Sequence, residues 1–206
     1  MFGLTRGRAI AIAVAIVAGV VIGVGLRFVM PGAGGSGART TGFVDPGIGG
    51  PFHLVDQDGR ERTDADFRGK LMLVEFGYTS CPDICPLGLQ LFADVLDQLG
   101  PDADQVQPIF ITVDPGRDTP DQLRGYVSHF SPRIVGLTGS EQDLATAARE
   151  YRVYYKLGAD RATNPNYTVD HSAILYLMGR DGRFVTHFTH ETPVDRVVGT
   201  IRSKLG

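Results

Sequence analysis

The chain contains two cysteines, Cys81 and Cys85, which lie shortly after the apolar stretch LMLVEF. We expect the second to lie in the first turn of a helix, which places both sulfurs on the same side. Helix N-terminal amides lower the pKa of a thiol, and the resulting thiolate is both a nucleophile and a soft-metal ligand. The spacing therefore predicts a redox-active or metal-binding pair. The alternative is a plain stabilising disulfide, which is frequent outside the cytoplasm but gains little entropy across so short a loop.

Hydrophobic periodicity predicts an α/β domain that holds this pair at the carboxyl end of a buried strand. Strands are expected at 52–55, 71–76, 106–113, 134–137, 172–178 and 183–188. Helices are expected at 87–99, 119–130 and 140–151, and from residue 192 onward. This order fits a thioredoxin-like fold with helices on both faces of the sheet, although the periodicity alone fits any three-layer α/β domain.

Composition and charge exclude one class of function. Of 206 residues, 43% are hydrophobic and 9% aromatic, as in a globular domain with a sizeable core. The net charge is −3, and because four arginines precede the first acidic residue, Asp45, the remainder of the chain is more acidic still. An acidic domain without a basic stripe is a poor ligand for phosphate backbones, so nucleic-acid binding is excluded.

The N-terminal segment has the pattern of a membrane anchor. The uncharged apolar run 9–26 is long enough to cross the hydrocarbon core, and Arg6 and Arg8 before it place the N-terminus in the cytoplasm. We predict a cytoplasmic tail at 1–8, an anchor at 9–30, a glycine-rich flexible linker at 31–42 and the globular domain at 43–206. A cleaved signal peptide is the alternative.

Three segments in this order, FGYTSCPDICP, VDPGRDTP and VDHSAILYLMGRDGRFVTHF, resemble the Sco/SenC family of copper-delivery proteins. The resemblance covers essentially the whole domain. It implies that Cys81, Cys85 and His171 are copper ligands. It also implies a role in building the dinuclear copper site of cytochrome c oxidase subunit II, from the periplasmic side of the cytoplasmic membrane. Another periplasmic copper carrier would then be the donor.

The residue types agree with that implication. Two thiolates and one imidazole form a soft set that suits Cu(I) and tolerates Cu(II), whereas a structural zinc site would want a fourth ligand. Without the resemblance, a surface histidine bonded to a neighbouring carboxylate would be the favoured interpretation of His171. Asp114 ends the strand beside the cysteine-bearing one. It either lies near the metal, as an outer-shell acceptor or a weak extra ligand, or caps the Pro115-Gly116 turn.

A thiol:disulfide reductase that keeps the acceptor's cysteines reduced is the competing function. Thioredoxin-type oxidoreductases have a proline opposite the redox pair, whereas the corresponding stretch here, 169–172, has none. Their cysteines are also usually separated by two residues, not three. Both differences favour metal binding, although the two roles can coexist. A copper or redox sensor is a third possibility, but the short predicted tail has no room for an output domain.

Four further histidines carry less weight. His187 and His190 flank the end of the last predicted strand, where they either assist transient copper capture or are half-exposed strand residues. His53 and His129 lie in no motif.

Overall fold

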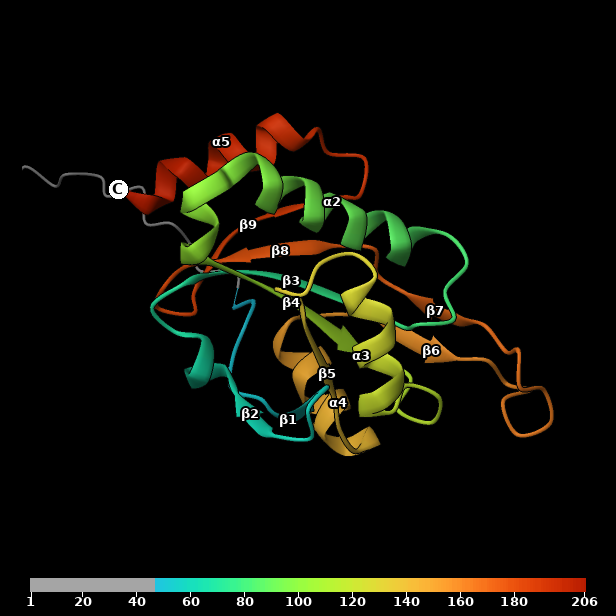
Figure 1. Ribbon diagram of the computed structural model, residues 1–206. Coiled ribbons are helices and arrows are strands. Elements are labelled where there is room, and N and C mark those ends of the chain that lie inside the picture. Colours follow the sequence, from blue (N-terminus) through green and yellow to red (C-terminus); the bar gives the residue numbers. More distant parts are fainter. Residues whose placement is uncertain (1–46) are drawn as a thin grey trace, which may run out of the picture. The chain divides into compact units, whose positions relative to one another are not determined.

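The computed structural model describes residues 47–206, which contain a seven-stranded sheet in the order β2-β1-β5-β4-β3-β8-β9 (Figure 1). Its strands are β1 (His53–Asp56), β2 (Glu61–Thr63), β3 (Leu71–Gly77), β4 (Val106–Thr112), β5 (Val135–Thr138), β8 (Leu175–Met178) and β9 (Phe184–Phe188). Strands β3, β4 and β5 are parallel, and β8 pairs antiparallel with β3. A separate hairpin joins β6 (Tyr155–Leu157) to β7 (Val169–His171).

Helices cover both faces of the sheet. They are α2 (Ile84–Leu99), α3 (Pro120–Ser128), α4 (Glu141–Glu150) and α5 (Val194–Leu205), and short 3-10 turns occupy Asp64–Phe67 and Gly100–Gln105. Helices α2 and α5 lie side by side across one face (Figure 1). On the opposite face, Tyr151 at the end of α4 packs against Phe76 and Tyr176. Because both faces are covered, all seven residues of β3 are buried.

Helix α3 shares the face of α2, and the sheet register explains why. Glu75, Phe110 and Gly136 are aligned across β3, β4 and β5, so they project from the same face. The α2 helix approaches Glu75 at Gly88, and α3 approaches Gly136 through Leu123. Two successive right-handed crossovers in the same direction put both helices on that face.

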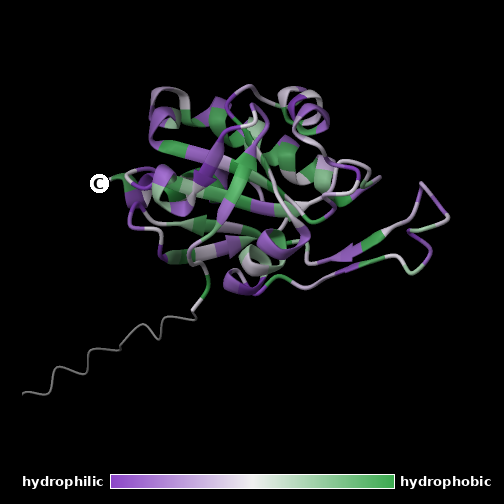
Figure 2. Cartoon of the chain, turned by 90° about the horizontal axis from the view of Figure 1, so that it is seen from below, coloured by the Kyte–Doolittle hydropathy of each residue, from purple (hydrophilic) through white to green (hydrophobic). Residues whose placement is uncertain are grey.

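The thioredoxin-like fold is confirmed by the β4-β3-β8-β9 core with α2 and α5 on one face and α4 on the other. The main error is at 172–178, where the chain forms no continuous strand. The segment through His171 ends the β6–β7 hairpin, and β8 begins only at Leu175. Strands β2, β6 and β7 were not expected, because each is only three residues long and carries little apolar alternation. The hairpin projects from the body of the domain (Figure 2).

The predicted tail at 1–8, anchor at 9–30 and linker at 31–42 all lie outside the described residues. Within 47–206, no helix is both long and apolar enough to span a bilayer.

Candidate metal centre

The first part of the centre is the loop between β3 and α2. The helix begins at Ile84, earlier than the expected 87, so Cys85 lies in its first turn as the spacing required. Cys81 precedes the helix and donates its backbone N–H to the carbonyl oxygen of Tyr78 at 3.1 Å. Cys85 is fully buried, and Cys81 is 8% exposed, so only Cys81 reaches the surface.

Gly77 at the end of β3 makes room for the second sulfur. A Cβ atom at this position would lie 2.6 Å from Sγ of Cys85 and 2.8 Å from the ring of Phe110. No side chain larger than hydrogen fits there without displacing one of these groups, so the glycine allows the helix to seat Cys85 directly against the strand.

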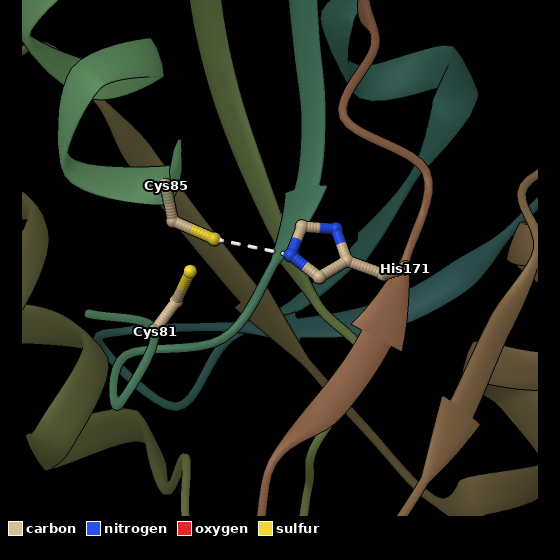
Figure 3. Close-up of side chains that lie close together, drawn as sticks. All are labelled: Cys81, Cys85 and His171. Carbon is tan, nitrogen blue, oxygen red and sulfur yellow. Dashed lines mark hydrogen bonds between the residues drawn. The ribbon is translucent and has the colours of Figure 1, made fainter. Parts of the chain in front are cut away.

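The second part of the centre is His171, the last residue of β7. Its Nε2 atom lies 3.4 Å from Sγ of Cys85 and points toward the two sulfurs (Figure 3). Its Nδ1 atom lies 3.2 Å from the carbonyl oxygen of Ser172. Because that oxygen can only accept, Nδ1 carries a hydrogen and donates it there, and Nε2 is the ring nitrogen that faces the sulfurs.

The structure thus brings together the three residues that the sequence had singled out. One ligand atom from each of Cys81, Cys85 and His171 lies within 4.8 Å of the others, close enough to hold one metal ion. Both cysteines are free thiols.

The two thiols differ in acidity. A hydrogen bond from Cys85 lowers the pKa of Cys81, and contacts with His171 and the backbone N–H groups of Asp83 and Cys85 add to this effect. The same hydrogen bond, together with burial and the charge of Glu75, raises the pKa of Cys85. Cys81 is therefore the thiolate of the apo pair and Cys85 the thiol that donates to it.

A carboxyl group that the sequence analysis overlooked lies behind the pair. Glu75 is 3% exposed, and its Oε2 atom is buried without a hydrogen-bond partner within residues 47–206. Burial, and secondarily the charge of Cys81, raise its pKa well above the usual value. The side chain fits because α2 has Gly88 opposite, where a Cβ would lie 2.4 Å from both carboxyl oxygens. The glutamate inside the otherwise apolar stretch LMLVEF was the sequence feature that could have revealed this buried carboxyl group.

Asp114 lies outside the group of three. It is 1% exposed and forms an ion pair with Arg117, while its other oxygen accepts a hydrogen bond from the hydroxyl of Tyr167. Its backbone carbonyl also accepts from the N–H groups of Arg117 and Asp118, so it does close the turn.

The remaining histidines in the described part of the chain do not join the group. His187 is exposed on β9 and stacks on Phe184, with ring centroids 6.4 Å apart. His190 follows β9, His53 lies near Glu61, and His129 ends α3.

Comparisons with known proteins give a consistent result. The family described as SCO1/SenC matches residues 43–206. The mitochondrial SCO2 homolog of Homo sapiens is 42% identical over 167 residues, which are 80% of this chain and 62% of that protein, so the chain spans less than two thirds of that relative.

Two solved structures share the fold. Copper-bound ScoI of Bradyrhizobium japonicum is 44% identical and has a TM-score of 0.71, with 76% of this chain and 99% of that chain covered. BsSco is 25% identical and has a TM-score of 0.63, with 76% of this chain and 92% of that chain covered. It is described as a member of the Sco family of cytochrome c oxidase assembly proteins with a disulfide switch.

Proposed function

The chain belongs to the SCO1/SenC family, and from this premise we propose that it is a copper chaperone that assembles cytochrome c oxidase. It takes up copper through Cys81, Cys85 and His171 and passes the ion to the dinuclear copper site of subunit II. The copper-bound relative from Bradyrhizobium japonicum supports the choice of metal.

The convergence of two sulfurs and one imidazole within 4.8 Å carries this proposal. Thiolates and imidazole select Cu(I) over hard cations, and a set of three leaves the coordination of the ion open on one side. Within residues 47–206 no fourth histidine, cysteine or carboxylate joins the group. An incoming thiolate or imidazole of an acceptor can therefore bind the ion before the chaperone releases it, which allows transfer by ligand exchange.

The test is the spectrum of the chain loaded with Cu(II). The wild type should show a thiolate-to-Cu(II) charge-transfer band, which Cys81→Ser and Cys85→Ser should abolish and His171→Ala should weaken or shift. His187→Ala is the matched control, because His187 is an exposed histidine outside the group. A His171→Ala spectrum identical to the wild type would exclude His171 as a ligand.

Thiol:disulfide reduction is the second candidate, and the lowered pKa of Cys81 favours it. In this reaction the thiolate of Cys81 attacks an acceptor disulfide, and Cys85 then resolves the mixed disulfide, which leaves the pair oxidised. Oxidase assembly in cells separates the two functions. A pure reductase requires both cysteines and tolerates His171→Ala, whereas a copper chaperone loses assembly in all three variants.

We further propose that the predicted anchor at 9–30 holds the domain in the periplasm, where a second copper carrier supplies the ion. The apolar run 9–26 and the arginines before it support this topology. A reporter enzyme that is active only outside the cytoplasm, fused after residue 206, should be active. An inactive fusion would contradict the topology.

A further inference from the structure

We propose that segment 114–118, between β4 and α3, positions the two loops that carry the metal ligands. In this arrangement Asp118 holds the cysteine loop and Arg117 holds the hairpin that carries His171. The inference rests on the proposed copper site, and it adds two positioning residues that do not touch the ion.

Asp118 connects the end of β4 to the cysteine loop. Its side chain is fully buried and accepts hydrogen bonds from the backbone N–H of Thr79 at 3.0 Å and from the Thr79 hydroxyl at 2.6 Å. It also accepts the hydroxyl hydrogen of Thr112, the last residue of β4, at 2.5 Å. Since Thr79 is two residues before Cys81, these bonds fix the path of the chain into the thiol pair.

Arg117 connects the same segment to the hairpin. Its guanidinium lies 3.7 Å from the ring centroid of Tyr167, just before β7, and donates from Nη1 to the carbonyl oxygen of Pro165 at 3.1 Å. Asp114 completes the arrangement, since one carboxylate oxygen accepts from Arg117 Nε and the other from the Tyr167 hydroxyl. Buried Asp114 therefore holds both the Arg117 guanidinium and the Tyr167 ring in their stacked arrangement.

The guanidinium also reaches toward the cysteine side of the centre. Its Cζ atom lies 5.6 Å from the ring centroid of Tyr78, the residue that follows β3. The Tyr78 ring in turn meets the imidazole of His171 edge-on, with centroids 5.7 Å apart and an interplanar angle of 86°. Arg117 therefore supports His171 through Tyr167 within the hairpin and through Tyr78 behind the imidazole.

Such support matters because the hairpin has little of its own. Strands β6 and β7 contain three residues each and form a separate two-stranded sheet that projects from the domain (Figure 2). An isolated hairpin of this size is at best marginally stable. Groups that orient a metal ligand from behind typically contribute about 10–100-fold to metal affinity.

The test compares Arg117→Lys with Arg124→Lys in the full chain. Lysine keeps the charge of Arg117 but loses the planar group that stacks and donates from several nitrogens. Arg124 is the matched control, because it is a half-exposed arginine on α3 that pairs with Asp121. Arg117→Lys should lower the affinity of the chain for Cu(II) about 10–100-fold. It should also weaken the hyperfine coupling to the His171 nitrogen in the electron paramagnetic resonance spectrum of bound Cu(II). Arg124→Lys should match the wild type in both measurements.

A double-mutant cycle shows whether Arg117 acts through His171. In a His171→Ala background, Arg117→Lys should cause no further loss of affinity. Asp118→Asn should cause the same loss with or without His171, because it acts through the cysteines. Unchanged affinity in Arg117→Lys, or an equal loss in the His171→Ala background, would overturn the assignment of Arg117. If Asp118→Asn lowered copper affinity only in the chain with intact His171, the assignment of Asp118 would be overturned.

Amide hydrogen exchange of the apo chain tests the positioning roles without copper. Arg117→Lys should speed exchange at 158–171 and leave 78–83 protected, whereas Asp118→Asn should do the reverse. Tyr167→Phe removes only the hydroxyl bond to Asp114 and should also speed exchange at 158–171. It replaces Arg117→Lys in this test if that variant does not fold. Identical exchange in these variants and the wild type would refute the inference even if copper binds as proposed.

Discussion

Replacing Gly77 by alanine tests how closely the helix seats Cys85 against the sheet. The new Cβ would lie 2.6 Å from the sulfur and 2.8 Å from the ring of Phe110, whereas ordinary contact begins at 3.4 Å. Since Cys85 and Phe110 are both fully buried, neither has free space to occupy. The sulfur must move by about 0.8 Å, the difference between those contacts.

This displacement should lower both the stability of the domain and its affinity for copper. Overpacking of this kind costs about 1–3 kcal/mol of unfolding free energy. Metal–donor distances tolerate only about 0.2 Å of error, so the displacement should also lower copper affinity at least about tenfold.

Two measurements on the full chain check this prediction. Urea unfolding of the apo protein gives the change in stability, and competition with a chromophoric copper chelator gives the change in affinity. Gly125→Ala is the control, because Gly125 lies in α3 with nothing within 4 Å of its added Cβ. It should be neutral or stabilise by up to about 1 kcal/mol. If Gly77→Ala matched the wild type in both measurements, Cys85 could not be packed against residue 77 as described.

Three further predictions concern the groups around the thiols. Because burial raises the pKa of Glu75, the carboxyl is neutral in both states below its unfolded pKa, and stability falls as the pH rises through the folded pKa. Glu75→Gln should flatten this dependence in urea unfolding from pH 4 to pH 9, and an unchanged slope would contradict the burial argument. Gly88→Ala should destabilise the domain, because its Cβ would lie 2.4 Å from the Glu75 oxygens. Adding Glu75→Ala should restore part of the lost stability. Additive losses of stability in the double variant would show that the two residues are not in contact. Iodoacetamide at pH 6 should alkylate Cys81 before Cys85, because Cys81 is more exposed and has the lowered pKa. Mass spectrometry of the peptides reports the order of labelling. Faster labelling of Cys85 would contradict the assignment of Cys81 as the thiolate.

The sequence predicted the cysteine side of the centre well because its information is local. The apolar stretch before the pair and the helical spacing after it placed both sulfurs correctly. His171 was identified through the family resemblance, since the polar stretch around it has no periodicity that predicts a short hairpin. That hairpin depends on pairing between residues 155–157 and 169–171, which no local pattern encodes.

The long-range partners of the supporting residues could not be predicted for the same reason. Arg117 contacts Pro165, 48 positions away, and Asp118 contacts Thr79, 39 positions away. The position of Asp114 at the end of its strand predicted a place near the metal or at a turn. The structure shows the turn and adds a contact with Tyr167 that only the folded chain creates. Glu75 illustrates a different limit, because the strand pattern indicated burial but not the glycine that accommodates the carboxyl group.

X-ray absorption at the copper edge of the Cu(I)-loaded full chain tests the central claim most directly. Two sulfur neighbours and one nitrogen neighbour are expected for the wild type, and His171→Ala should lose the nitrogen while the sulfurs remain. A wild-type ion bound by sulfur alone, or one with the same neighbours in His171→Ala, would contradict a site formed by Cys81, Cys85 and His171.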